Sequence, residues 1–235
     1  MPVDLSKKNR PSVSVVLPFY KQNDHAVSTI IDCANEMETL AMPFELIAVY
    51  NGVGSLQSSK ERRELKNPSS AIEILLREAG WGYAVKAGIE EAHGDYICYT
   101  NSARTDMKEL VKLIRYALLS KDYIVKATRI ARETSTRKWV SRLYNLSNRM
   151  ILATPIWDVN ATPKIIPRNI LEKLGPIESN GDSIDAEVLF KAHQKAIPII
   201  EIPSNQIQRR GGTSTTKVIS SGAKMFYDLC KIRIR

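Results

Sequence analysis

The stretch from Gly94 to Asp106, GDYICYTNSARTD, decides the fold class of this chain. Its first half has the apolar and aromatic residues of a buried strand, and a polar loop follows at once. In an α/β enzyme, ligands bind beyond the carboxyl ends of the strands. A loop that handles a charged phosphate donor usually carries acidic metal ligands there. This loop instead offers an amide at Asn101, a hydroxyl at Ser102 and a methyl at Ala103.

Strands and helices are expected to alternate on both sides of that stretch. Short apolar and β-branched runs predict strands at residues 13–18, 44–50, 71–76, 95–100, 123–128, 164–167 and 198–203. Apolar residues at helical spacing predict helices near 23–37, 81–93, 107–118 and 139–150, a short one ending at Gly175, and one at 183–195. The alternation predicts an α/β fold, with a mainly parallel central sheet and helices on both faces.

Composition and charge limit the possible partners. The chain has 235 residues, 43% of them hydrophobic, which suits one compact domain with a tail. Its net charge of +9 favours anionic partners, namely nucleic acid, phospholipid headgroups or phosphorylated small molecules, unless it only reflects a lysine-rich surface. No apolar run approaches the ~20 residues that span a bilayer, and the polar start has no apolar signal region. The scattered Cys33, Cys98 and Cys230 predict reduced thiols and a cytoplasmic protein.

Two glycine clusters argue against a dinucleotide-binding dehydrogenase. Gly52 and Gly54 lack a third glycine at the required spacing. Gly80 and Gly82 follow the third predicted strand, whereas the dinucleotide motif follows the first. A nicotinamide enzyme is therefore disfavoured.

The ordered pieces of the chain resemble glycosyltransferase family 2, over about residues 12–217. Within the family they are most similar to polyprenyl-phosphate mannosyl- or glucosyltransferases of the dolichol-phosphate mannose synthase type. The fragments that carry the likeness include VSVVLPFYKQND, FELIAVYNGVG, GWGYAVKAGIEEAHGDYICYTNSA, WDVNATPKIIPRNIL, GDSIDAEVLFKAHQKAIPIIEIP and RRGGTS. The resemblance implies a GT-A (Rossmann-like) domain at 12–208, with a nucleotide-sugar half at 12–105 and an acceptor half at 106–208. An N-terminal extension (1–11) and a basic C-terminal segment (209–235) flank it.

The resemblance also implies a set of donor-binding residues. These are Pro18, Tyr20, Asn51, Gly80, Gly82, Asn101, Ser102, Ala103 and Arg104. Three positions that are acidic in the family are neutral or basic here. The nucleoside-holding pair aligns with Tyr50 and Asn51, residues 21 and 22 are Lys and Gln, and the Asp-x-Asp motif aligns with residues 101–103. Mg²⁺ or Mn²⁺ is usual in the family, but these cations prefer carboxylates. No metal ligand and no cofactor are predicted.

Without a metal, cationic side chains are the expected partners of the diphosphate. The candidates for phosphate or acceptor binding are Lys126, Arg129, Lys164, Arg209 and Arg210, together with Arg104 in the quoted loop and the acceptor-side Asp158. Each cation has an ordinary alternative, which is to face water.

Asp185 and Glu187 are the candidate catalytic residues, because the resemblance puts a carboxylate of this helix near the acceptor. A carboxylate can serve as general base for a hydroxyl acceptor, whereas a phosphate acceptor needs only positioning. The alternative for Asp185 is a structural role in the first turn of its helix. Asp106, three residues before Glu109, is expected to cap a helix. The three histidines share no metal-ligand spacing.

The C-terminal segment AKMFYDLCKIRIR interleaves apolar and basic residues. It is expected to lie on an anionic membrane surface, to dock as a helix, or to fray. No nucleic-acid-binding module is visible, so a nucleic-acid partner is not expected.

The sequence therefore predicts a glycosyltransferase with little or no metal dependence, although it leaves that dependence and the presence of turnover open. It would move a sugar from a nucleotide sugar to a lipid-phosphate or other glycan acceptor, in the cytoplasm or at the inner face of the membrane. The alternative is a catalytically inactive GT-A domain that binds a nucleotide sugar or a partner. The sequence leaves the sugar, the base, the acceptor and the oligomeric state open.

Overall fold

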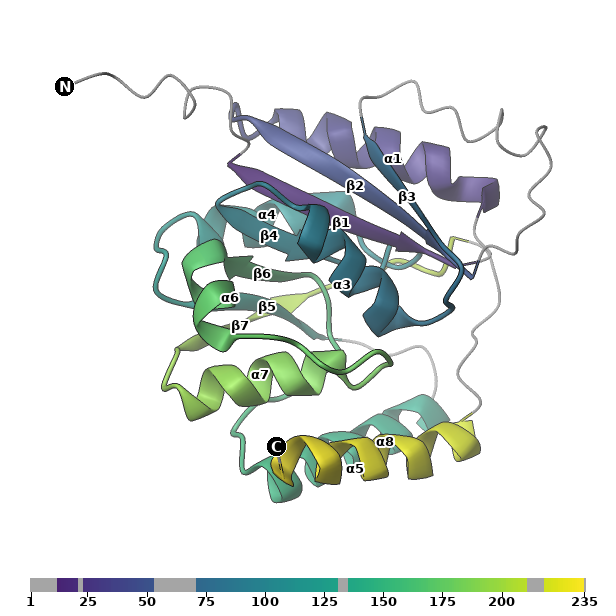
Figure 1. The fold of residues 1–235 in the computed structure, drawn as a ribbon. Coiled ribbons are helices and arrows are strands. Elements are labelled where there is room, and N and C mark those ends of the chain that lie inside the picture. Colours follow the sequence, from purple (N-terminus) through teal and green to yellow (C-terminus); the bar gives the residue numbers. More distant parts are fainter. Residues whose placement is uncertain (1–11, 21–22, 53–70, 131–134, 211–217, 235) are drawn as a thin grey trace.

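A computed structural model describes residues 12–20, 23–52, 71–130, 135–210 and 218–234 of the chain. One seven-stranded sheet runs through them in the order β3-β2-β1-β4-β6-β5-β7 (Figure 1). The strands are β1 (Val13–Phe19), β2 (Phe44–Asn51), β3 (Ile72–Leu76), β4 (Tyr96–Tyr99), β5 (Ile124–Arg129), β6 (Lys164–Pro167) and β7 (Ile199–Ser204).

The first four strands are parallel and end at the same edge of the sheet. β1 pairs with β2 and β4, and β2 pairs with β3, all in parallel register. All seven residues of β1 are buried because helices cover both faces, which explains its continuous apolar sequence. The loops that follow β1, β2 and β4 therefore lie side by side.

β6 runs against its neighbours in the middle of the sheet. It pairs antiparallel with β4 and with β5, while β5 and β7 are parallel. This register sets Lys164 opposite both Tyr99 and Lys126. The prediction of a mainly parallel α/β sheet is confirmed. The antiparallel strand β6 brings Lys164 next to Lys126 inside the sheet.

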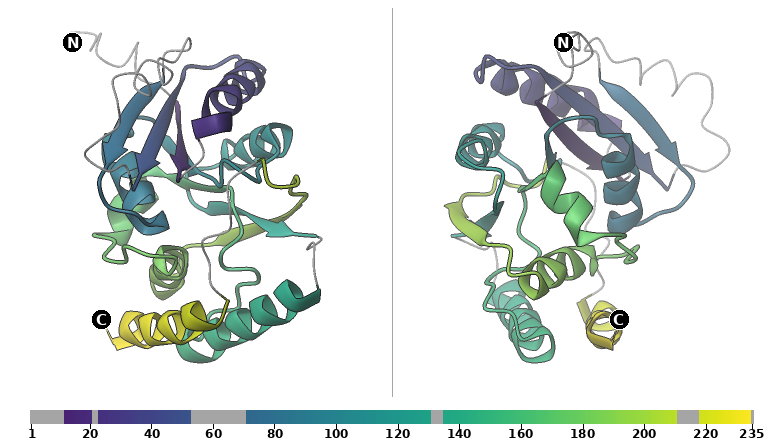
Figure 2. Two further views of the ribbon diagram at one scale, coloured as in Figure 1. Left: turned by 90° about the vertical axis from the view of Figure 1, so that its right-hand side faces the viewer. Right: turned by 60° about the vertical axis from the view of Figure 1, so that its left-hand side comes forward.

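Helices cover both faces of the sheet, as predicted (Figure 2). On one face, α1 (Asn23–Glu38) and α4 (Met107–Ala117) form an apolar core with β1, β2 and β4. On the other face, α3 (Trp81–Glu91), α6 (Arg168–Leu174) and α7 (Ile184–Gln194) form a second core. The Asp106 carboxylate accepts a hydrogen bond from the backbone N–H of Lys108, so the predicted cap is confirmed.

A third layer consists of α5 (Ser135–Leu152) and α8 (Val218–Ile234), which lie against each other beyond α7 (Figure 1). Leu229 and Ile232 of α8 are buried with Leu189 and Phe190 of α7 in a third apolar cluster. The C-terminal segment is thus a docked helix over residues 218–234. A frayed tail, one of the arrangements considered for it, does not describe this part of the chain.

Candidate active site

The parallel edge of the sheet carries a polar residue at the end of β2. Asn51 is buried, and its side-chain amide donates to the carbonyl of Phe19 at 2.9 Å. The Asn51 side-chain oxygen accepts from the backbone N–H of Gly80 at 3.1 Å. Gly52 follows with a φ of +72°, and a Cβ there would lie 2.6 Å from the Tyr20 ring. Asn51 therefore ties the ends of β1 and β2 to the start of α3.

The loop after β4 is closed by its own side chains. The Ser102 hydroxyl donates to the carbonyl of Pro18 at 2.5 Å. The Asn101 side-chain oxygen accepts from the backbone N–H of Ala103 at 3.2 Å. Ser102 and Ala103 are both buried. Only an amide and a hydroxyl, each already bonded, stand where a metal-binding motif would need carboxylates, so these residues do not fit a divalent cation.

The same holds outside this loop, across the described part of the chain. There, no group of three or more His, Cys, Asp or Glu side chains is arranged to hold a metal ion.

A later segment crosses this loop. The backbone N–H of Arg210 donates to the carbonyl of Ala103 at 2.9 Å, and that of Ile207 donates to the carbonyl of Arg104 at 3.1 Å. The Arg210 guanidinium reaches Asp32 of α1 at 2.6 Å. Arg104 and Arg209 are both partly exposed. The structure thus brings three predicted arginines to the β4 loop, and it engages the side chain of Arg210 with a carboxylate.

The glycine turn before α3 packs against a distant loop. A Cβ on Gly82 would lie 2.5 Å from the backbone carbonyl carbon of Asn180. The backbone N–H of Tyr83 also donates to the Asn180 carbonyl at 3.2 Å. Gly82 therefore allows a close approach of two backbones.

Glu187, a predicted catalytic residue, holds the loop that contains Asn180. Its two carboxylate oxygens accept from the backbone N–H groups of Glu178 at 2.9 Å and Ser179 at 2.7 Å. Lys191 lies 3.0 Å from the same carboxylate. Burial opposes ionisation of Glu187, but the hydrogen bonds prevail and lower its pKa. Glu187 therefore anchors the loop that contains Glu178 and Ser179.

Asp185, the other predicted catalytic residue, accepts hydrogen bonds from three side chains. Its Oδ1 accepts hydrogen bonds from Lys164 Nζ at 2.6 Å and from the Tyr99 hydroxyl at 3.0 Å. Its Oδ2 receives Trp81 Nε1 at 3.1 Å. The carboxylate is buried, and its donors come from β6, β4 and α3. Burial, followed by the nearby Asp185 charge, raises the pKa of Tyr99 well above its usual value.

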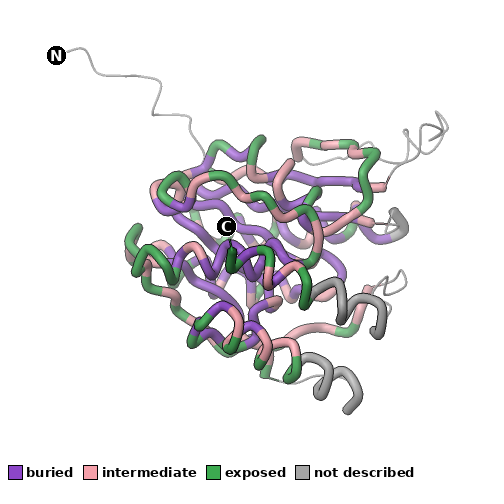
Figure 3. The backbone as a smooth tube through the Cα atoms, turned by 60° about the horizontal axis from the view of Figure 1, so that its bottom comes forward, coloured by how far each residue is buried: buried purple, intermediate pink, exposed green. Residues whose placement is uncertain are grey.

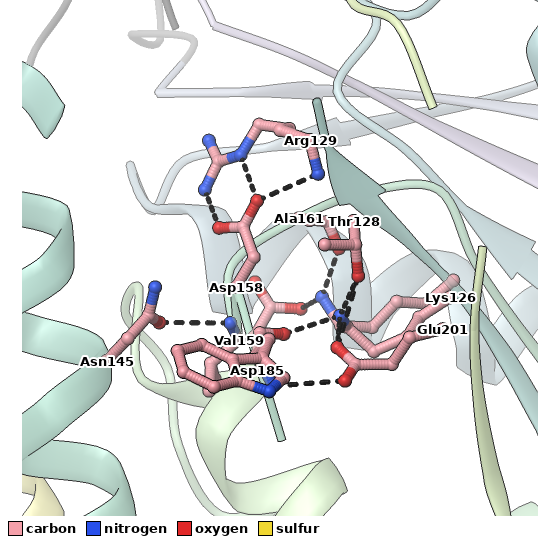
Figure 4. Close-up of polar contacts among 11 residues, drawn as sticks. Lys126, Thr128, Arg129, Asn145, Asp158, Val159, Ala161, Asp185 and Glu201 are labelled. Carbon is pink, nitrogen blue, oxygen red and sulfur yellow. Dashed lines mark hydrogen bonds and ion pairs between the residues drawn. The ribbon is translucent and has the colours of Figure 1, made fainter. Parts of the chain in front are cut away.

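Lys126 forms a second buried ion pair next to the first (Figure 4). Its Nζ lies 2.6 Å from Glu201 Oε1 of β7 and 2.8 Å from the carbonyl of Trp157. Burial and, to a smaller extent, the neighbouring Lys164 charge lower the pKa of Lys126 to about 8, against the opposing effect of Glu201. Burial also lowers the pKa of Lys164, although Asp185 opposes this.

A third ion pair lies at the end of β5. The Arg129 guanidinium contacts both oxygens of Asp158, with Nε at 2.7 Å from Oδ2. The backbone N–H of Arg129 donates to the same carboxylate at 3.1 Å. Asp158 has a φ of +46°, which a side-chain-bearing residue adopts only when its surroundings hold it. Figure 4 shows this pair beside the Lys126 and Asp185 contacts.

The three pairs make a charge-balanced cluster of Lys126, Arg129, Lys164, Asp158, Asp185 and Glu201. The sequence predicts that the cations of this cluster bind a diphosphate or face water. The structure engages each with a carboxylate of the chain. A phosphate that binds one of these groups has to share or displace that carboxylate.

Three polar side chains, Tyr144, Asn148 and Asn160, are gathered near Asp185. The Tyr144 hydroxyl is buried and has Asn148 and Asn160 as its neighbours. Burial raises the pKa of Tyr144, and the charges of Asp185 and Asp182 act in the same direction, against the hydrogen bonds with the two asparagines.

Sequence reasoning missed three partners of these charged residues, namely Trp81, Tyr99 and Glu201. Glu201 had a detectable signal, because it is a carboxylate inside the apolar strand sequence PIIEIP. A charge in such a strand predicts a buried partner.

The comparisons with known proteins agree with this architecture. The sequence model of the family described as "Glycosyl transferase family 2" matches residues 14–175. A protein of Pseudomonas fluorescens SBW25 named undecaprenyl-phosphate 4-deoxy-4-formamido-L-arabinose transferase is 23% identical over 167 residues, which are 69% of this chain and 48% of that protein. A protein of the same name from Serratia proteamaculans is also 23% identical, over 69% of this chain and 51% of its own. The chain spans about half the length of the curated relatives it matches.

The solved structures establish the fold. Glucosyl-3-phosphoglycerate synthase of Mycobacterium tuberculosis, in complex with uridine diphosphate, is similar with a TM-score of 0.71. The sequence identity is 16%, and the match covers 97% of this chain and 82% of that one. The same enzyme with Mn²⁺, UDP-glucose and phosphoglyceric acid has a TM-score of 0.71 and 81% coverage of its chain. The similarity at this identity concerns the fold alone.

Proposed function

Because the chain belongs to glycosyltransferase family 2, we propose that it transfers a sugar from a nucleotide-sugar donor to a lipid-phosphate acceptor. The curated relatives carry names that state transfer to undecaprenyl phosphate. One observation of the structure carries the proposal. The Asp185 carboxylate accepts hydrogen bonds from Tyr99 of β4 and Trp81 of α3. These bonds hold a carboxylate of the proposed acceptor half next to the strand and helix of the proposed donor half.

The donor would lie along the edge formed by Asn51 and residues 101–104, beyond the carboxyl ends of the parallel strands. In the transfer, an acceptor oxygen attacks the anomeric carbon, and the bond from that carbon to the diphosphate oxygen breaks. The nucleoside diphosphate leaves with the electron pair. We assign the cationic contact with it to Arg104 and Arg209, because their two segments are hydrogen-bonded to each other at Ala103.

The acceptor side of the proposal uses Asp185 for positioning. Its carboxylate already accepts hydrogen bonds from three donors of the chain, which hold it in place. An ionised phosphate acceptor needs no general base, so this arrangement suits a lipid phosphate better than a hydroxyl.

The reaction would take place at the cytoplasmic surface of a membrane, because a lipid-phosphate acceptor stays in the bilayer. Within the described residues, no helix combines the length and the apolar character needed to cross a bilayer.

A transfer assay tests the function directly. The full chain is incubated with UDP-, GDP- and dTDP-sugars and undecaprenyl phosphate, with Mn²⁺ or with a chelator. We expect sugar transfer from one donor class at rates that the chelator leaves within about twofold. The Asp185→Asn variant removes the carboxylate charge at nearly constant side-chain volume and should lower kcat/KM at least tenfold, as expected for a loss of ~1.4 kcal/mol.

Calorimetric titration with the same nucleotides distinguishes an active transferase from an inactive binding module. Nucleotide binding without transfer would favour the inactive GT-A binding module. An absence of both binding and transfer for every donor would exclude the proposed donor site.

A further inference from the structure

We propose that the outer surface of α5 and α8 binds an anionic membrane surface. Six large apolar side chains define this α5–α8 face, and all are more than half exposed. They are Leu143, Leu146 and Met150 on α5, and Phe226, Tyr227 and Ile234 on α8. The two helices lie side by side at one end of the molecule, as both views of Figure 2 show.

The exposed residues follow the helical repeat. Leu143, Leu146 and Met150 are three and four residues apart, so they share one side of α5. On α8, Leu229 and Ile232 are buried against α7, while Tyr227 and Ile234, seven residues apart on one side of the helix, are exposed. Figure 3 shows the alternation of buried and exposed residues along the described parts of both helices. Each helix therefore has an inner apolar side in the core and a second, uncovered one.

The charge of the two helices indicates which surface covers them. Their sequences contain seven basic residues and one acidic residue, Asp228. This net charge of +6 is two thirds of the chain's +9, in helices of 18 and 17 residues. Asp228 accepts from Ser183 at 3.2 Å, so the acidic group faces α7. Arg142, Lys231 and Arg233 are exposed among the apolar residues.

Apolar side chains interleaved with Lys and Arg are typical of helices that lie in the headgroup layer of a membrane. Basic residues gain from the negative potential of anionic lipids, and the apolar ones enter the acyl boundary. Trp157 adds an exposed aromatic residue at the end of α5, with the Arg149 guanidinium 4.1 Å above its ring. A protein partner would explain the apolar residues but gives no reason for the basic excess.

The position of the α5–α8 face relative to the site also supports membrane docking. α7 contacts α5 and α8 through the third apolar cluster and contributes Asp185 to the charged cluster on its other side. Docking on lipid therefore places the acceptor side of the site one helix layer from the membrane. The inference deepens the proposed function by naming the surface that meets the acceptor's membrane.

Vesicle flotation tests the inference with the full chain and no donor or acceptor present. A failure of docking is therefore distinguishable from a failure of transfer. We expect binding to vesicles with about one third anionic lipid, and weak binding to zwitterionic vesicles. Binding to the anionic vesicles should fall as salt is raised, because salt screens exposed charges.

Matched variants show whether the α5–α8 face is responsible. Met150→Gln removes an apolar side chain that is 75% exposed, and Leu119→Gln removes one that is 76% exposed beyond α4. We expect about tenfold weaker vesicle binding for the first and no change for the second. Lys231→Gln should weaken binding about fivefold, and Lys108→Gln on α4 should leave it unchanged.

Three results would overturn the inference. One is a chain that binds neither kind of vesicle, and another is equal binding to both. The third is an α5–α8 face that joins two copies of the chain, in which case Met150→Gln would dissociate a dimer in size-exclusion chromatography while vesicle binding stayed the same.

Discussion

At the residue scale, the buried Lys164–Asp185 pair is the contact on which the site depends. Both side chains are buried, and the pair has Tyr99 and Trp81 as further partners of the carboxylate. Removing one member of a buried ion pair is costly because it leaves the other charge uncompensated. Neutralising both members avoids that cost.

Lys164→Met should lower the free energy of unfolding by about 3–5 kcal/mol, because Asp185 stays charged in an apolar setting. Lys164→Met combined with Asp185→Asn should be more stable than Lys164→Met alone. Urea denaturation of the two variants and the wild type measures both values. A double variant that is less stable than the single one would show that charge compensation is not what the lysine provides.

Lys126 makes stability depend on pH in the alkaline range. Its pKa is about 8 in the folded chain, below the ordinary value of 10.5, so the unfolded chain binds more protons between these two values. Wild-type stability should therefore rise between about pH 8 and pH 10, by up to ~1.4 kcal/mol per pH unit, relative to Lys126→Met. Urea denaturation across this range checks the difference. Parallel pH profiles would mean that Lys126 keeps its ordinary pKa.

At the element scale, the fit between the start of α3 and the loop at Asn180 depends on a missing side chain. Both glycines of the sequence Gly80-Trp81-Gly82 were predicted to bind the donor. The structure gives Gly82 a close contact with the backbone of Asn180. This contact joins two segments that the sequence separates by about 100 positions, so the glycine pattern alone had no means of indicating it.

Gly82→Ala should destabilise the chain by about 1–3 kcal/mol, because the new Cβ would lie 2.5 Å from a backbone carbon. Helix propensity favours alanine by ~1 kcal/mol and is outweighed. Gly181→Ala is the matched control, since a Cβ there meets nothing within 4 Å. Chemical denaturation measures both. Equal stability of the two variants would mean that the loop yields to the methyl group.

At the scale of the whole molecule, α8 belongs to the same cooperative unit as the sheet. Leu229 of α8 is buried with Leu189 of α7, which in turn covers the sheet. Leu229→Ala should lower the free energy of unfolding by about 2–5 kcal/mol in a single transition. Ile234→Ala, at a position 86% exposed, should change it by less than ~0.5 kcal/mol. A separate transition for α8 would contradict this.

The sequence predicts the elements of the molecule better than the contacts of its site. The strand at Lys164–Pro167 is found at its predicted bounds, because its apolar run is short and bordered by charge and proline. Ion pairs such as Lys126–Glu201 join residues 75 positions apart, and sequence periodicity carries no information about such distances. The docking of α8 was likewise undecided, because its apolar residues fit both a core and a lipid surface.

The segment from Ser204 to Arg210 connects the β4 loop with α1 and lies shortly before α8 in the sequence. It is hydrogen-bonded to Ala103 and Arg104, and Arg210 is ion-paired with α1. Only seven residues separate Arg210 from Val218, the first residue of α8. If the β4 loop binds a nucleotide and the α5–α8 face binds lipid, as proposed, a shift of this segment on nucleotide binding would link the two binding events thermodynamically. By reciprocity, vesicles would then change nucleotide affinity by the same factor by which the nucleotide changes vesicle affinity.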